Sequence, residues 1–315
     1  MENVILQTNK ITKSYRHFMA LDDISITLEA GHIYGFIGEN GAGKTTLMRI
    51  LTGLSLPTSG SYSLFGKTEH AEIQTARRRI GSTIEEPTLY PEFSAYRNLE
   101  LERILIGNPD KSVCDELLKL LDLYDVRNKK VKEFSMGMKQ RLGIALALIG
   151  KPELLILDEP VNGLDPKNIS SLRVLLKKLN EERGITMLIS SHILNELYLL
   201  ATDYIIIHKG KIIESLSHEQ LEAKCENYVK VCTDSLPQCV TIIEKELKIS
   251  DYKVMDDHTL HIYAFTEEPQ RISQVLMQNN IVVSELSVCG QSLEEYFLSV
   301  TGGGRDVKFA KGGVL

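Results

Sequence analysis

Apolar and polar residues alternate over the first 30 positions of the chain, most regularly across residues 21–28. Alternation with a period of two is typical of strands with one buried face, so this stretch predicts an antiparallel β-subdomain. Residues 32–37 are mostly apolar and predict a buried strand. Apolar positions at helical spacing follow from Thr46, which predicts a helix directly after a short connecting loop.

Residues 94–150 carry apolar side chains at helical spacing, interrupted by Asn108, Pro109 and Asp110, and predict a largely helical lobe. Strands and helices then alternate, which implies a mostly parallel sheet. The predicted elements are a strand over 154–157, a helix over 167–182, a strand over 185–190 and a helix over 192–200.

The pattern changes near residue 224, where a smaller domain is predicted. Its elements are strand 227–233, helix 236–247, strand 250–255, strand 258–265, helix 267–279, strand 281–288 and helix 291–300. The first six follow the order β-α-β-β-α-β, which is the split, ferredoxin-like arrangement of an α+β domain. We therefore expect domains at 1–223 and 224–300 and a flexible tail at 301–315. No residue in the smaller domain indicates catalysis, so packing, dimerisation or regulation is expected of it.

The loop after the first buried strand fits G-x-x-x-x-G-K-[ST] at every fixed position. Its residues, with the next position, are Gly38, Glu39, Asn40, Gly41, Ala42, Gly43, Lys44, Thr45 and Thr46. Glycines let successive backbone N–H groups point inward, and the helix N-terminus favours anions. Lys44 is expected to reach the β- and γ-phosphates of a nucleotide, and the Thr45 hydroxyl to bind Mg²⁺.

Two acids, Asp158 and Glu159, end the apolar run 154–157, at the edge where open α/β sheets bind their ligands. Adjacent strand residues point to opposite faces, so the two acids are expected to differ in role. Asp158 would hold Mg²⁺, directly or through water. Glu159 would act as the general base that orients the attacking water.

Together these motifs resemble the ATP-binding subunits of ABC transporters, over roughly residues 1–215. Tyr15 is similar to the aromatic residue that stacks on adenine in that family. Ser135 and Gly137 match the signature motif, which meets the γ-phosphate of ATP held by the opposite subunit. Asp165 lies in a loop that resembles the one crossing the dimer interface, and His192 resembles the switch histidine.

Three positions depart from the usual family pattern. Met136 and Met138 replace a Gly and the Gln of the signature, and Glu85 stands where most members have a Gln that touches Mg²⁺ and water. Glu85 keeps an oxygen ligand but adds a charge. These features resemble the subgroup that exports lantibiotics and bacitracin-like peptides and confers immunity.

Composition bears on the class of protein and on its possible partners. The chain has 315 residues, 43% hydrophobic and 25% charged, as in ordinary globular proteins. A net charge of −6 argues against a nucleic-acid partner. Neither a signal peptide at the start nor an apolar run long enough to span a membrane is found. The five cysteines have no metal-ligand spacing, which suits a reducing cytoplasm.

The resemblance therefore implies an α/β fold of the ABC type and an ATPase using ATP and Mg²⁺. It would dimerise with a second copy or a paralogue and power export through a separate membrane permease, from the cytoplasmic face of the membrane. The alternative is a soluble ABC-type ATPase acting on a ribosome, DNA or another complex. Relatives of that kind carry two cassettes or long coiled-coil insertions, which this chain lacks. An ordinary kinase or GTPase would leave the signature and His192 unexplained.

Overall fold

The computed structural model describes residues 3–225, 227–290 and 293–301. It divides into two compact units between His218 and Glu219, inside helix α8 (His218–Cys225). The boundary predicted between residues 223 and 224 falls in the same helix. The predicted flexible tail lies outside the described residues from residue 302 onward.

A six-stranded sheet forms the centre of the first unit. Its strand order is β10-β9-β4-β8-β7-β6, and all neighbours are parallel except β10, which pairs antiparallel with β9. The strands are β4 (Ile33–Ile37), β6 (Ile80–Thr83), β7 (Leu154–Asp158), β8 (Thr186–Ser191), β9 (Asp203–His208) and β10 (Lys211–Ser217). The mostly parallel sheet predicted from the sequence is confirmed, and its parallel strands end at one common edge.

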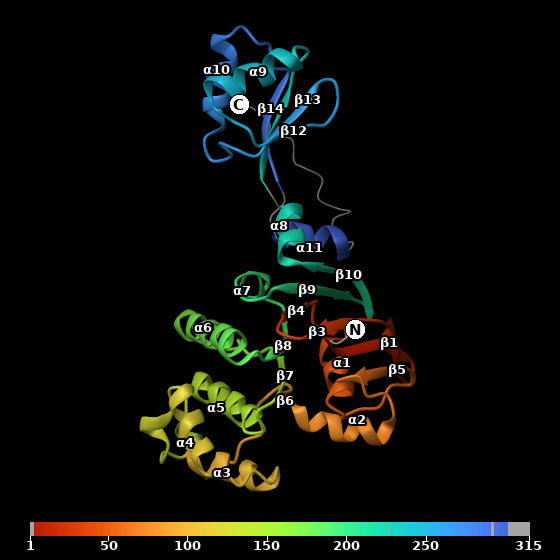
Figure 1. Cartoon of the computed structure of the whole chain (residues 1–315), viewed down its shortest axis with the longest axis vertical. Helices are drawn as coiled ribbons and strands as arrows, with labels where there is room; N and C mark the ends of the chain where they lie inside the picture. Colours follow the sequence, from red (N-terminus) through yellow and green to blue (C-terminus); the bar gives the residue numbers. More distant parts are fainter. Residues whose placement is uncertain (1–2, 226, 291–292, 302–315) are drawn as a thin grey trace. The chain divides into compact units, whose positions relative to one another are not determined.

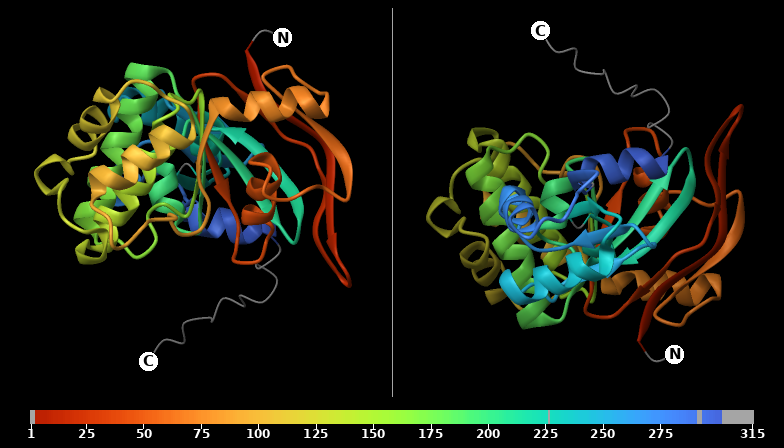
Figure 2. Two further views of the ribbon diagram at one scale, coloured as in Figure 1. Left: turned by 90° about the horizontal axis from the view of Figure 1, so that it is seen from below. Right: turned by 90° about the horizontal axis from the view of Figure 1, so that it is seen from above.

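A second, antiparallel sheet contains the start of the chain, as predicted. Strand β1 pairs with β2, β3 and β5. Their bounds are β1 (Val4–Tyr15), β2 (Phe18–Ile24), β3 (Thr27–Glu29) and β5 (Ser59–Leu64). Figures 1 and 2 show this sheet on one side of the six-stranded sheet and helices α3 to α5 gathered as a lobe on the other.

Helices cover the six-stranded sheet and build the predicted lobe. They are α1 (Lys44–Leu51), α2 (His70–Ala76), α3 (Ala95–Leu105), α4 (Ser112–Leu120), α5 (Met136–Leu148), α6 (Pro166–Arg183) and α7 (Leu194–Tyr198). Side chains of α1 such as Leu47 pack with Phe36, Ile156 and Leu188 of the sheet, all of them fully buried. Burial of this kind contributes about 1.5–3 kcal/mol for each large apolar side chain.

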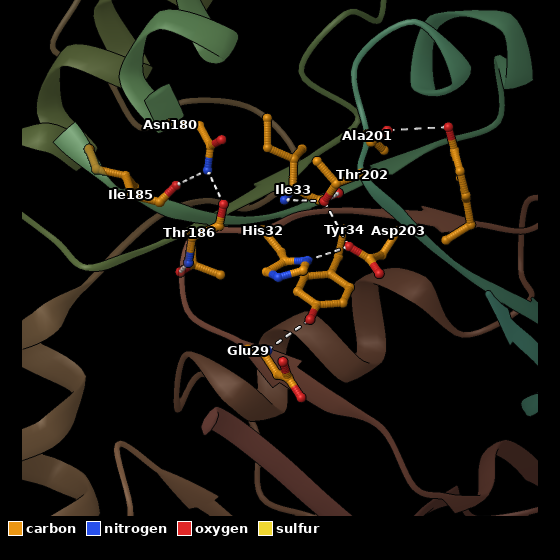
Figure 3. Close-up of polar contacts among 12 residues, drawn as sticks. Glu29, His32, Ile33, Tyr34, Asn180, Ile185, Thr186, Ala201, Thr202 and Asp203 are labelled. Atoms are coloured by element: carbon orange, nitrogen blue, oxygen red, sulfur yellow. Dashed lines mark hydrogen bonds and ion pairs between the residues drawn. The ribbon is translucent and has the colours of Figure 1, made fainter. Parts of the chain in front are cut away.

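Polar side chains tie the opposite edge of the sheet together, where β4, β8 and β9 begin (Figure 3). His32 Nδ1 lies 2.6 Å from an Asp203 carboxylate oxygen, and the Thr202 hydroxyl accepts the N–H of Ile33 at 3.0 Å. The Asn180 amide donates to the carbonyl of Ile185 at 2.9 Å. These contacts fix where each strand starts and hence where its far end lies.

The second unit is a four-stranded antiparallel sheet with the order β12-β13-β11-β14. Its elements are β11 (Tyr228–Cys232), α9 (Leu236–Glu246), β12 (Tyr252–Val254), β13 (Thr259–Ile262), α10 (Pro269–Gln278), β14 (Glu285–Cys289) and α11 (Leu293–Thr301). The predicted β-α-β-β-α-β succession is present. Val229, Val231 and Ile262 of the sheet form a core with Ile243 of α9 and Leu276 of α10.

Several predicted bounds were wrong. The helix expected over 192–200 is limited to α7, because Ile193 has an extended backbone and its N–H donates to the Ser191 hydroxyl. The strands expected over 250–255, 258–265 and 281–288 are shorter or start later than predicted. Among the described residues, no helix has the length and apolar character needed to cross a membrane.

Candidate functional site

The predicted phosphate loop joins β4 to α1, at the edge where the parallel strands end. Gly43 precedes the helix with a φ of 113°, and a Cβ there would come within 2.7 Å of the Ala20 carbonyl oxygen, so the turn requires glycine. Because glycine has no capping side chain, the N–H groups of the first turn, at Lys44, Thr45 and Thr46, remain available to an anion.

Lys44 is buried beneath this loop, with 6% of its side chain exposed. Its ammonium donates to the carbonyl of Gly38 at 2.5 Å and lies 3.3 Å from Glu159 Oε1. A buried ammonium needs such partners. Loop carbonyls and a carboxylate therefore hold Lys44 in place at the centre of the site.

Asp158 is the last residue of β7, and both of its carboxylate oxygens accept hydroxyl hydrogen bonds. Thr45 Oγ1 donates to Oδ2 at 2.7 Å, and Ser190 Oγ donates to Oδ1 at 2.5 Å. Hydroxyl and carboxylate oxygens are the ligands that Mg²⁺ prefers. Thr45 and Asp158, two of the three predicted metal ligands, are thus close enough to hold one ion together.

Glu159 follows directly, with a left-handed backbone (φ 49°) that turns its side chain toward the loop. Its Oε2 lies 2.8 Å from His192 Nδ1. Its Oε1 is buried and, within the described residues, accepts no hydrogen bond, since the Lys44 ammonium is near but misaligned. Lys44, Glu159 and His192, three of the predicted site residues, therefore form one continuous chain of polar contacts.

The predicted signature residues lie on the helical lobe. Ser135 caps α5 by accepting the N–H of Met138 at 3.3 Å. Gly137 packs so closely that a Cβ would come within 3.2 Å of Asn168 Cγ. Asp165 in turn caps α6 and accepts the backbone N–H of Asn168 at 2.8 Å. Asn168 thereby joins Gly137 to Asp165, and its hydrogen bonds lower the pKa of Asp165.

Two predicted residues lie apart from both groups. Tyr15 ends β1 with 45% of its surface exposed, and the Lys13 ammonium lies 4.9 Å from its ring centroid. The backbone of Glu85 is left-handed (φ 60°), as is that of Glu159, and the Glu85 carboxylate accepts a hydrogen bond from Arg49 at 2.7 Å. In the described part of the chain, no hydrogen bond or ion pair joins Glu85 to Thr45 or Asp158.

Sequence reasoning overlooked Arg49, Asn168 and Ser190, which contact predicted site residues. For Ser190 a signal was present, because Ser190 and Ser191 continue an apolar strand up to His192. A polar residue at the end of a buried strand is a candidate for contact with neighbouring strand ends.

Comparisons with known proteins show which family the chain resembles. The family model for ABC transporters matches residues 21–162. The bacitracin transport ATP-binding protein BcrA of Bacillus licheniformis is 40% identical over 302 residues, covering 96% of this chain and 99% of the relative. The lantibiotic transport ATP-binding protein SrtF of Streptococcus pyogenes is 42% identical over 228 residues, 71% of this chain and 97% of the relative.

Solved structures show the same fold. An ATP-binding cassette in a dimeric, post-hydrolysis state with ADP and Pi superposes with a TM-score of 0.63 at 27% identity, covering 68% of this chain and 99% of the other. The Clostridium perfringens protein cbiO1, part of the ABC transporter complex cbiONQ, gives 0.64 at 25% identity, with 78% and 97% covered.

Proposed function

The chain belongs to the ATP-binding subunits of ABC transporters, an ATPase family, and on that premise we propose that it powers export of a peptide antibiotic through a separate membrane permease. The observation that carries this proposal is the continuous contact of Lys44, Glu159 and His192 beside the Thr45–Asp158 pair. That arrangement occurs in a chain similar along nearly its whole length to a bacitracin transport protein.

Nucleotide binding would begin with an exchange of partners at Lys44. The phosphates would accept hydrogen bonds from the first-turn N–H groups of α1, and Lys44 would move its ammonium from Gly38 and Glu159 to the β- and γ-phosphates. Tyr15, exposed at the end of β1, would stack on the adenine ring. Mg²⁺, held by Thr45 and Asp158, would neutralise charge on the phosphates.

The exchange at Lys44 would free Glu159 for its role as general base. Its buried Oε1, which accepts no hydrogen bond within the described residues, would take a proton from the attacking water. His192, 2.8 Å from Oε2, would fix the orientation of the carboxylate and approach the γ-phosphate. Hydrolysis would thus depend on the release of the ion pair between Lys44 and Glu159.

The site would be completed by a second subunit, identical or paralogous. Within the described residues, neither Ser135 nor Gly137 makes a hydrogen bond to the phosphate loop of its own chain. Ser135 lies at a helix N-terminus, where N–H groups favour an anion. A face-to-face pair would bring Ser135 and Gly137 of one chain to the γ-phosphate held by Lys44 of the other.

A cleft of about 330 Å³ offers a docking place for the permease. It is bounded by the end of β6 and the loop after it, together with Leu54, Glu102 of α3 and Leu146 of α5. Leu54 is 69% exposed, and burial raises the pKa of Glu102. The lining is largely polar, with the exposed Leu54 and the partly buried Glu102 carboxyl, and it suits a short segment that carries an apolar and a basic residue. Docking there would place the chain at the cytoplasmic face of the membrane.

Affinity purification of the tagged chain with its co-expressed candidate permease tests this proposal. Leu54→Glu places a charge in the cleft and should abolish co-purification while ATPase activity persists. Leu56→Glu is the matched control, because Leu56 is similarly exposed at 63% but does not line the cleft. Co-purification that survives Leu54→Glu would contradict docking in this cleft. Export is tested by tolerance to bacitracin or a lantibiotic, which should be lost with Lys44→Ala.

A further inference from the structure

Ser190 lies in the middle of the six-stranded sheet, at the level of the two acids. It is opposite Phe36 of β4 on one side and Asp158 of β7 on the other. None of its surface is exposed. Polar groups buried this deeply are normally hydrogen-bonded, so the Ser190 hydroxyl is expected to have partners within the site.

The hydroxyl contacts both acids at once. It donates to Asp158 Oδ1 at 2.5 Å and accepts the backbone N–H of Glu159 at 2.9 Å. A serine hydroxyl has one hydrogen to donate and lone pairs to accept, so these two bonds are compatible and define its orientation. Ser190 is therefore a bridge between the side chain of one acid and the main chain of the next.

The two hydrogen bonds orient different groups, the Asp158 carboxylate and the Glu159 backbone. The bond to Oδ1 leaves Asp158 Oδ2 directed at Thr45, whose hydroxyl donates to it at 2.7 Å. The bond to the Glu159 N–H supports a left-handed backbone, which is unfavourable for a residue with a Cβ. From that backbone the Glu159 side chain reaches both Lys44 and His192.

We propose that Ser190 is a positioning residue for ATP hydrolysis, setting the direction of the Asp158 carboxylate and the backbone turn of Glu159. This inference rests on the roles proposed above for those acids. Ser190 also lies two residues before His192, which follows the end of β8 at Ser191, so one short segment orients the base and presents its histidine partner. Loss of the hydroxyl would lower turnover, while nucleotide affinity, supplied by the loop N–H groups and Lys44, would be retained.

An isosteric pair of variants separates this role from packing. Ser190→Thr keeps the hydroxyl and adds a methyl group. Ser190→Val has nearly the shape of threonine but no hydroxyl. A cavity of about 10 Å³, lined by Ser190, Ile189 and Leu197 among others, adjoins the site and can receive part of the added methyl group. Thr186→Val is the matched control, since Thr186 is a fully buried hydroxyl at the other end of β8 that bonds Gly31 N–H.

Steady-state ATPase assays, binding of a fluorescent ATP analogue and thermal unfolding are measured for all three. Ser190→Val should lower kcat about 10- to 100-fold, as is usual for removing a residue that orients a metal or catalytic ligand, with the KM for ATP changed by less than about twofold. Ser190→Thr should restore most of the turnover. Thr186→Val should lower the unfolding temperature without lowering kcat.

Equal turnover in Ser190→Val and Ser190→Thr, whether high or low, would overturn the inference. So would a fall in analogue affinity that accounts for the whole loss of kcat/KM. If Ser190→Val does not fold, Ser190→Ala repeats the comparison with the wild-type chain. Normal turnover in Ser190→Ala would equally overturn it.

A double-mutant cycle with Glu159→Gln distinguishes this inference from the proposed function itself. If Ser190 acts through Glu159, adding Ser190→Val to Glu159→Gln should cost much less turnover than adding it to the wild-type chain. Unchanged hydrolysis in Glu159→Gln alone would contradict the assignment of the base. A severe defect in Glu159→Gln beside normal turnover in Ser190→Val would contradict only the role of Ser190.

Discussion

The guanidinium of Arg49 donates a hydrogen bond of 2.7 Å to the carboxylate of Glu85. Arg49 lies on α1, the helix that follows the phosphate loop. Glu85 lies in the loop after β6, and its neighbours Ile84 and Glu86 line the cleft. The pair thus joins the nucleotide-binding helix to the proposed docking place. It also balances the charge that Glu85 adds where most family members have Gln.

Replacing Glu85 with Gln should therefore alter coupling more than nucleotide binding. The side chains are 42% and 58% exposed, and exposed ion pairs typically contribute less than about 1 kcal/mol, so the fold should tolerate the change. The expected result is altered stimulation of ATPase activity by the permease, with Mg-ATP affinity little changed in a titration. Arg49→Gln, which breaks the same pair from α1, should give a similar coupling defect. A collapse of metal affinity in Glu85→Gln would instead make Glu85 a primary metal ligand.

Glu159→Gln should retain ATP binding while hydrolysis falls by at least about tenfold, because the amide cannot accept the proton of water. The amide also removes the charge that holds Lys44 at 3.3 Å, so ATP affinity should not fall. Glu153→Gln is the control, since this exposed acid precedes the same strand and pairs with Arg79 away from the site. Single-turnover assays with labelled ATP measure both quantities, and near-normal turnover would remove Glu159 from its role.

Lys44→Ala should lose both nucleotide binding and hydrolysis. The variant removes the Lys44 ammonium, which lies 3.3 Å from Glu159 Oε1. It also leaves the Gly38 carbonyl oxygen without the hydrogen bond that Lys44 donates. Lys178→Ala, at an exposed lysine on α6, is the control for loss of a positive charge. Equilibrium binding of a fluorescent ATP analogue is the measurement, with thermal unfolding recorded alongside. Intact affinity in Lys44→Ala would contradict the phosphate-loop assignment.

Ser135→Arg should place a bulky cation at the proposed interface and block ATP-dependent dimerisation. It also removes a helix cap, which costs about 0.5–2 kcal/mol in stability. Ser94→Arg is matched for that loss, because Ser94 caps α3 on the same lobe by accepting the N–H of Arg97. Sedimentation of each variant, in the Glu159→Gln background with Mg-ATP, should show dimers for Ser94→Arg and none for Ser135→Arg. Normal dimers in Ser135→Arg would exclude the composite site.

Local patterns predicted most of the fold and the positions of the candidate residues. The strand, glycine-rich loop and helix around Lys44 are adjacent in sequence, and Asp158 ends a continuous apolar strand, so periodicity alone locates them. Ser135 was located by the signature motif, and the structure makes it the cap of α5.

Contacts between segments that are distant in the sequence could not be predicted in this way. Ser190 is hydrogen-bonded to Asp158 and Glu159, which lie 32 and 31 residues earlier in the sequence. Arg49 donates to Glu85, which lies 36 residues later. Helix α7 begins later than predicted because the residues before it serve the site. The Ile193 N–H donates to the Ser191 hydroxyl, and His192 Nδ1 lies 2.8 Å from Glu159 Oε2. Helical propensity describes such residues poorly, since tertiary contacts override it.

The central claim is that a single chain does not contain a finished reaction centre. Steady-state ATPase activity per molecule, measured over a dilution series of the purified chain at saturating Mg-ATP, tests it most directly. Because association follows mass action, activity per molecule should fall in proportion to concentration once isolated chains predominate. Activity per molecule that stays constant down to that range would contradict the claim.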